Sequence, residues 1–165
     1  MEVLREYHAA LGEIIHRFEG TLERFLGDGL MVLFNDPVPC PDPAMRAVKM
    51  AVVMRDRVMG LAERWRKHGR ELGFGVGIAQ GYATLGRIGF EGRFDYAAIG
   101  TVANLAARLC TEAKSGQILI TQRILNEVED LVEVQDLGEL MLKGLSHAIH
   151  AHDVRRLRNQ QPSAV

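Results

Sequence analysis

The sequence is poor in the features that mark several classes of protein. Its 165 residues include two cysteines, Cys40 and Cys110, which lie far apart without a CxxC partner, so neither a disulfide framework nor a structural zinc site is expected. No apolar run approaches the roughly 20 residues that cross a bilayer, so we expect no membrane contact by this segment. The formal net charge of -1 gives no reason to expect nucleic acid as a partner. These absences favour a reduced, cytoplasmic protein.

What is present is the composition of one globular domain. Hydrophobic residues make up 47% and charged residues 25% of the chain, which are shares typical of a folded domain. Apolar residues at helical spacing begin with Leu4, so the N-terminus is interpreted as an amphipathic helix and the chain as beginning inside structure. We expect a single domain over residues 1–158 and a frayed polar tail over 159–165.

Periodicity and turn residues predict an alternation of helices and hairpins. Helices are expected over 4–18, from Pro43 to about 68, from Thr101 to about 114 and near 122–128. Hairpins are expected over 22–34 and within 72–100, followed by strands at 116–121, 132–134, 139–142 and 149–154. The expected helix caps include Gly20, Asp42 and Thr101. This order indicates an α+β fold with helices on one face of a largely antiparallel sheet.

Asp28 stands between two glycines at the tip of the first expected hairpin. Asp-Gly is ordinary turn chemistry, because both residues tolerate positive φ, and this interpretation requires no function. The alternative is a Mg²⁺ ligand where two apolar strands end, since Mg²⁺ binds one or two carboxylates together with substrate phosphates. Asp28 alone would then be half of a metal site.

Asn104 and Arg108 are four residues apart on the expected helix that begins at Thr101, so both point from one face. An exposed Asn and Arg are commonplace on an amphipathic helix. The functional alternative is phosphoryl chemistry, because Arg offers five donors that fit a phosphate and Asn can orient a ribose oxygen. Lys143 is either a third cation of such a site or an exposed lysine at the end of a strand.

Three histidines near the C-terminus, His147, His150 and His152, raise the question of a metal site. Strand alternation would put His150 and His152 on one face, so a surface site is conceivable. The acidic residue considered as a further ligand is Asp153. We interpret these histidines as solvated side chains.

Three stretches, taken together, resemble successive blocks of the class III nucleotidyl cyclase catalytic domain. They are RFLGDGLMVLFNDP, GVGIAQGYATLGRIGFEGRFDYAAIGTVANLAARLCTEAKSGQILIT and LGELMLKGLSHAIHAHDV. The resemblance implies a ferredoxin-like fold of the βαββαβ type and a head-to-tail homodimer with active sites at the interface. It also implies cyclic-nucleotide signalling chemistry, in which two Mg²⁺ or Mn²⁺ ions assist attack of the ribose 3′-oxygen of a nucleoside triphosphate on its α-phosphorus.

The resemblance assigns roles to four residues. Asp28 falls on the family's second metal-binding Asp. Asn104 and Arg108 fall on the pair that orients the ribose and stabilises the transition state from the partner chain. Lys143 falls on a lysine of the late strands that contacts the triphosphate.

Two further positions would read the base. Arg24 stands where adenylate cyclases usually have Lys and guanylate cyclases Glu, and Ala97 stands where Asp or Thr is usual for adenine and Cys or a small residue for guanine. Ala97 cannot hydrogen-bond the base, which should weaken discrimination between purines. The positive charge of Arg24 argues against guanine, whose N1–H and N2 amine need an acceptor. We therefore expect ATP as the substrate.

The resemblance begins after the family's first strand, which ends in the first metal-binding Asp. We expect both to be missing from this chain, so the domain would be partial and its metal site incomplete. Three readings follow. The first is an adenylate cyclase, the second is a truncated or degenerate cyclase homology domain that dimerises or binds nucleotide without catalysis, and the third is an α+β domain with an unrelated binding function.

Overall fold

The computed structural model describes residues 2–26, 29–35, 39–82, 84–90, 93–99 and 101–158. In chain order, the elements are α1 (Glu2–Arg17), β1 (Thr21–Leu26), β2 (Gly29–Leu33), α2 (Pro43–Arg66), β3 (Val76–Ile78), β4 (Thr84–Phe90), β5 (Arg93–Ile99), α3 (Thr101–Glu112), β6 (Ile118–Thr121), α4 (Gln122–Val128), β7 (Val132–Leu140) and β8 (Ile149–Leu157). Each predicted helix is present. The expected tail at 159–165 lies outside the described residues.

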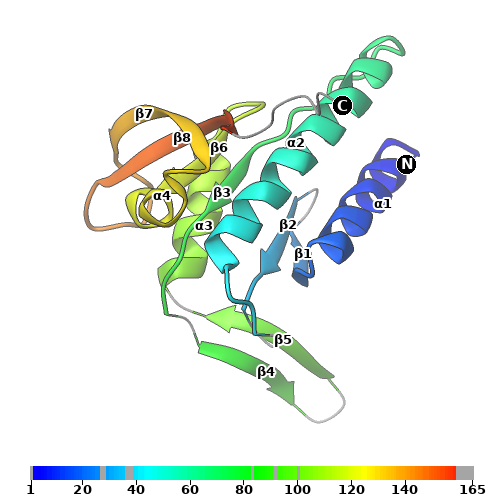
Figure 1. Cartoon of the computed structure of the whole chain (residues 1–165). Coiled ribbons are helices and arrows are strands. Elements are labelled where there is room, and N and C mark those ends of the chain that lie inside the picture. The colour runs from blue at the N-terminus through cyan, green and yellow to red at the C-terminus, as the bar shows by residue number, and fades with distance from the viewer. Residues whose placement is uncertain are drawn as a thin grey trace.

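The strands form one central sheet and two hairpins (Figure 1). The central sheet has the order β3-β6-β8-β7. Within it β3 and β6 are parallel, whereas β6 with β8 and β7 with β8 are antiparallel. The hairpins β1–β2 and β4–β5 are antiparallel, and β4–β5 projects from the body of the domain. The expected α+β class and largely antiparallel pairing are confirmed.

The first face of the central sheet is covered by α2 and α4. Strand β6 is buried along its whole length, and its residues Ile118 and Ile120 belong to a core cluster with Val48 and Val52 of α2 and with Ile124 of α4. Because alternate residues of a strand point to the same face, Ile118 and Ile120 meet the same pair of helices. This cluster is the main core of the domain.

The opposite face of the sheet is covered by α3. Leu119 points away from its two neighbours on β6 and clusters with the fully buried Leu109 of α3. Gly77 of β3 permits close approach, because a Cβ there would overlap the carbonyl of Ala106 and lie 2.8 Å from the Cβ of Leu109. The expectation of helices on one face therefore holds for α2 and α4 but not for α3, since a fully buried strand needs cover on both sides.

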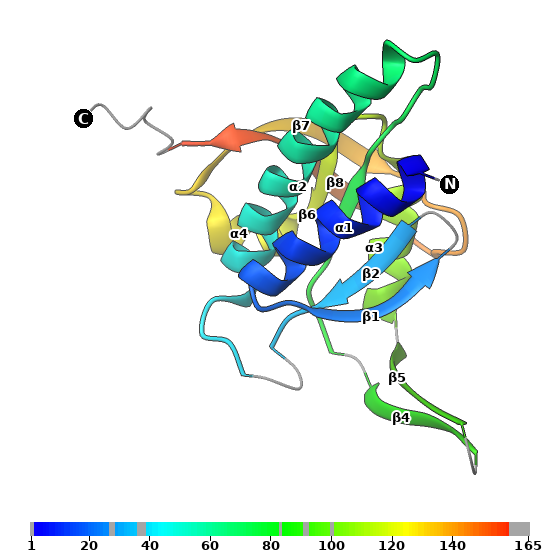
Figure 2. The same cartoon turned by 90° about the vertical axis from the view of Figure 1, so that its right-hand side faces the viewer.

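Helix α1 packs beside α2 and over the β1–β2 hairpin (Figure 2). Its apolar face, which includes Leu11 and Ile14, forms a second core cluster with Met54 and Val58 of α2 and with Phe74. The predicted amphipathic helix is thus a structural element of the domain. In the part of the chain that the structure describes, no helix is both long and apolar enough to cross a membrane.

The expected caps differ in detail. Glu19, with φ +58°, adopts the left-handed conformation after α1, in place of the expected Gly20. Asp42 precedes α2 but makes no side-chain cap hydrogen bond, and its carboxylate pairs with Arg46 at 3.2 Å. A side-chain N-cap bond is made by Thr121, which accepts from the backbone N–H of Ile124 at 3.3 Å.

The strands expected at 132–134 and 139–142 fall in one long strand with a bulge, whereas the one expected at 149–154 is part of β8. β7 runs from Val132 to Leu140, and its pairing with β8 shifts between Asp136 and Gly138. Gly138 has φ +73°, a conformation that glycine adopts without steric cost. The extra residue lets Leu137 and Leu140, three positions apart, both pack against the α3 side of the sheet.

Because β3 and α3 are in close contact at Gly77, we expect that adding one methyl group there destabilises the fold. Gly77→Ala should lower the free energy of unfolding by about 1–3 kcal/mol, because the helix backbone must move away. Urea denaturation followed by circular dichroism measures the change. The matched control is Gly60→Ala in α2, where the added Cβ meets nothing within 4 Å and should stabilise by about 0.5–1 kcal/mol. Equal effects of the two substitutions would contradict this account.

Candidate functional site

Helix α3 presents a polar face to solvent because its other face is fixed on the sheet. Leu109 is 0% exposed, whereas Asn104 and Arg108 are both exposed. A spacing of four residues on a helix places these two side chains next to each other on the outer face. The structure therefore brings together the amide and the guanidinium that the sequence singled out.

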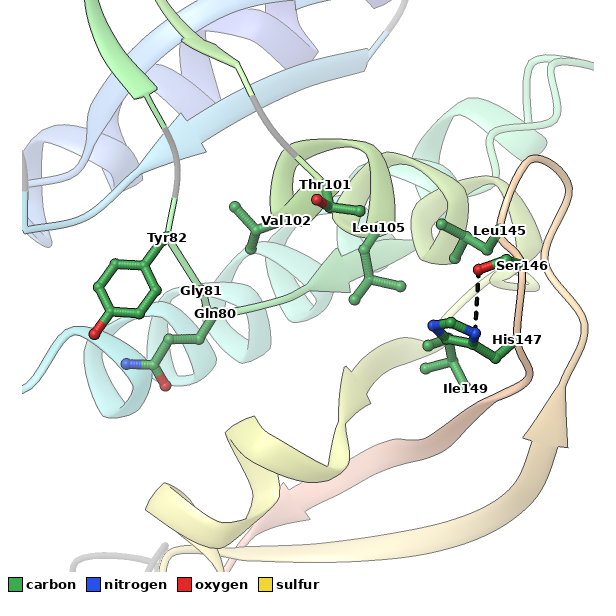
Figure 3. Close-up of a pocket in the computed structure, with 10 residues that line it drawn as sticks. All are labelled: Gln80, Gly81, Tyr82, Thr101, Val102, Leu105, Leu145, Ser146, His147 and Ile149. Carbon is green, nitrogen blue, oxygen red and sulfur yellow. Dashed lines mark hydrogen bonds between the residues drawn. The ribbon is translucent and has the colours of Figure 1, made fainter.

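A pocket of about 300 Å³ lies beside the start of α3 (Figure 3). It is lined by Gln80, Gly81, Tyr82, Thr101, Val102, Leu105, Leu145, Ser146, His147 and Ile149. In Figure 3, Gln80 lies at one end and His147 at the other, with Leu105 of α3 between them. The side-chain oxygen of Gln80 is buried without a hydrogen-bond partner in the structure. The pocket thus combines an apolar wall with polar residues at its two ends, Gln80 at one and Ser146 and His147 at the other, as ligand sites commonly do.

Lys143 is exposed in the turn between β7 and β8, two residues before the pocket residue Leu145. No hydrogen bond or ion pair within the described part of the chain joins Lys143 to Asn104 or Arg108. Lys143 is therefore close to the pocket lining in sequence but is not joined to the polar face of α3 in the described residues.

The other predicted positions lie on or between hairpin strands. Arg24 lies in β1 opposite Met31, and Ala97 lies in β5 opposite Gly86. Strands β1 and β5 contact each other, so the two expected base-reading positions are on neighbouring strands. Asp28 lies outside the described residues, although β1 and β2 on either side of it form the predicted hairpin.

The histidines divide between two places. His147 lines the pocket, where its Nδ1 lies 3.1 Å from the hydroxyl of Ser146. His150 and His152 lie on β8 and stack, with ring centroids 4.8 Å apart. Asp136 of β7 completes a group whose three potential ligand atoms lie within 4.8 Å of one another. The shared face of His150 and His152 is confirmed, whereas the interpretation of both as solvated is wrong for His152, which is 4% exposed.

The sequence suggested Asp153 as the acidic member of this group, but the structure places Asp136 there instead. Asp153 is 0% exposed, and it accepts hydrogen bonds from the backbone N–H of Ile118 at 3.0 Å and from Arg155 at 2.9 Å. It stabilises the pairing of β6 and β8. The sequence feature that could have pointed to Asp136 is Gly138 two residues later, because a glycine inside a strand often marks a bulge that changes which side chains face the neighbouring strand.

Hydrogen bonds and burial set the protonation of this group. The backbone N–H of Gly138, followed by the side chain of His150, lowers the pKa of Asp136. Burial lowers the pKa of His152, because a charged imidazolium is poorly solvated there. Asp136 is therefore ionised and His152 neutral at neutral pH.

Comparison with known proteins identifies the family. The chain matches the adenylate and guanylate cyclase catalytic domain over residues 1–155. It belongs to this family. The resemblance seen in the sequence blocks is thereby confirmed.

Two curated relatives of this cyclase domain are bacterial adenylate cyclases. Adenylate cyclase 1 of Rhizobium meliloti (strain 1021) is 28% identical over 155 residues, which are 92% of this chain and 23% of the relative. Adenylate cyclase of Anabaena cylindrica is 29% identical over 161 residues, which are 92% of this chain and 31% of the relative. The chain thus spans less than a third of the length of either relative.

Solved cyclases share the fold of this domain. The adenylyl cyclase CyaB from P. aeruginosa superimposes with a TM-score of 0.86 at 30% identity, covering 97% of this chain and 84% of that one. The guanylyl cyclase Cya2 gives a TM-score of 0.89 at 30% identity, covering 98% and 82%. These likenesses confirm the α+β nucleotidyl cyclase fold.

The buried Asp153 predicts a loss of stability when its carboxylate is removed. Asp153→Ala leaves the N–H of Ile118 buried without an acceptor, so we expect the free energy of unfolding to fall by about 1–3 kcal/mol. Thermal and urea unfolding measure the difference. Asp56→Ala is the control, since Asp56 is an exposed residue of α2 that pairs with Arg55 at 3.5 Å, and its loss should cost less than about 1 kcal/mol. A similar loss in both variants would show that Asp153 has no special structural role.

Proposed function

We propose that residues 1–158 act as a nucleotidyl cyclase domain. It would convert a purine nucleoside triphosphate to the 3′,5′-cyclic monophosphate and pyrophosphate. The observation that carries the proposal is the outward face of α3, where Asn104 and Arg108 are both exposed about one helical turn apart, on the helix whose first residues line the pocket. Neither Cys40 nor Cys110 forms a disulfide in the described part of the chain, which suits a role in the cytoplasm.

The face of α3 suits stabilisation of charge during phosphoryl transfer. Arg108 can donate two parallel hydrogen bonds to phosphate oxygens, and Asn104 can orient the ribose. Catalysis of this kind depends on positioning and on charge stabilisation. Because both side chains face outward, a nucleotide held by a second copy of the chain could reach them. This supports a homodimer with active sites at the interface.

Two Mg²⁺ or Mn²⁺ ions are the expected cofactors of the reaction. Asp28 offers the hard carboxylate oxygen that such ions prefer, and it is the residue of this chain that we assign to them. When bound, the ions would neutralise triphosphate charge and favour ionisation of the 3′-hydroxyl. Lys143, near the pocket, would add a positive charge for the triphosphate.

ATP is the substrate that the base-reading residues favour. Similarity does not separate the purines, because the adenylyl cyclase CyaB and the guanylyl cyclase Cya2 are both 30% identical to this chain. Arg24 brings donors, which suit the ring nitrogens of adenine better than the N1–H and N2 amine of guanine. Ala97 adds no polar contact, so discrimination should be modest.

The same Ala97 supports a second candidate function. A domain that no longer reads the base edge could dimerise and bind nucleotide as a regulatory module without catalysis. Assays with ATP or GTP and Mn²⁺ distinguish the two functions. Cyclic nucleotide formation supports the enzyme, whereas nucleotide binding without turnover supports the module.

The proposed role of α3 predicts an effect on turnover. Asn104→Ala and Arg108→Ala should each lower kcat by about 10²–10³-fold with KM changed by a few-fold at most, because the contacts strengthen in the transition state. Steady-state cyclase assays of the intact protein measure both constants. Arg57→Ala, at an exposed arginine of α2, is the control and should leave both unchanged. A loss confined to KM, or no loss, would refute the transition-state role.

Substrate preference provides an independent prediction. The double variant Arg24→Glu with Ala97→Cys should shift the ratio of kcat/KM for ATP over GTP toward GTP by about 10-fold or more, because Glu supplies the acceptor that guanine needs. Parallel assays with both nucleotides measure the ratio. An unchanged ratio would show that these positions do not read the base.

A further inference from the structure

Strands β7 and β8 bring three metal-ligating side chains together, away from the face of α3. Asp136 of β7 lies directly opposite His152 of β8, and Glu139 lies opposite His150. One potential ligand atom from each of Asp136, His150 and His152 lies within 4.8 Å of the others. Two imidazoles and a carboxylate form a common donor set for zinc.

The bulge at Gly138 produces this arrangement. In a regular strand, Asp136 and Glu139 would point to opposite faces, because side chains alternate. The extra residue restores Glu139 to the face of Asp136, where the Nδ1 of His150 lies 4.0 Å from Glu139. The acidic residues of β7 thus face the histidines of β8.

His152 supplies a buried nitrogen without a partner. The ring is 4% exposed, and its Nε2 donates a hydrogen bond of 2.8 Å to the side-chain oxygen of Gln122 in α4. This bond fixes the tautomer and leaves a lone pair on Nδ1, which is buried and has no hydrogen-bond partner in the structure. A buried polar atom normally has a partner. Metal ligands commonly have this pattern, with one ring nitrogen free and the other held by a neighbouring residue.

The other two side chains are free to adjust. The Nε2 of His150 and the backbone N–H of Gly138 both lie 2.7 Å from the same oxygen of Asp136. Asp136 is exposed and His150 half-buried, so small rotations would bring their donor atoms to the distances of about 2.0–2.2 Å that zinc requires. The buried His152 would be the fixed ligand.

We propose that Asp136, His150 and His152 bind a divalent transition metal ion, with zinc as the best match. Imidazole nitrogen favours zinc over magnesium or calcium. Three protein ligands leave a fourth position for water or for Glu139. A bound ion would join β7 to β8. Along the chain, β8 comes directly after the turn that contains Lys143 and after the pocket residues 145–147. The proposal uses none of the residues assigned to cyclase chemistry.

Zinc titration of the metal-free chain tests the site. Competition with a chromophoric chelator should show one zinc ion bound per chain. His150→Gln and Asp136→Asn should each weaken zinc binding by about 10-fold or more, and Gln122→Ala should weaken it by about 10–100-fold through loss of the bond that orients His152. Co²⁺ in place of zinc should give the visible absorption of a tetrahedral site, and His150→Gln should abolish it.

Two controls make the result decisive. His16→Gln removes an exposed histidine of α1 and should leave zinc affinity unchanged, as should Asp28→Asn at the residue assigned to Mg²⁺. Circular dichroism checks that each variant is folded, which is expected because Asp136 and His150 are not in the core. The proposal is overturned if zinc binds equally well to His150→Gln and Asp136→Asn, or if Asp28→Asn removes the binding.

Discussion

Strand β6 is buried on both of its faces, and each face holds a different layer of helices. Ile118 and Ile120 contact the cluster that contains α2 and α4, whereas Leu119 contacts the cluster that contains α3. The backbone of β6 is held in turn by β8, partly through the carboxylate of Asp153. The position of α3, and with it the outward direction of Asn104, therefore depends on β6 together with its neighbour β3, whose Gly77 lets the helix approach.

The two candidate sites of the domain, the polar face of α3 with its pocket and the group of Asp136, His150 and His152, depend on opposite faces of the same sheet. The α3 side supports Asn104, Arg108 and the pocket, while His152 is held from the other side through Gln122 of α4. Because β8 contributes to both sides, a change in its position would affect both. The short segment between Lys143 and His150 is their direct covalent link.

Local pattern was enough to predict most elements but not their arrangement. The apolar run at 118–121 and the helix at 122–128 follow from residues near one another in the sequence. The side of the sheet that α3 covers depends on Gly77, which is distant in sequence from the helix it meets. Asp136 was missed for the same reason, since its approach to His150 depends on strand register and on a bulge. The placement of Asn104 and Arg108 on one face of α3 was predictable because helical spacing is local.

The bulge in β7 makes the pairing of β7 with β8, as much as residue identity, a determinant of which side chains surround His150 and His152. If the strand kept Gly138 but paired regularly with β8, without the bulge, every side chain after that point would exchange faces. Glu139 would then turn toward the apolar layer under α3, and Leu140 toward the histidines. Related domains in which these residues pair without the bulge would therefore keep the same fold and the same pair of histidines but have a chemically different surface around them.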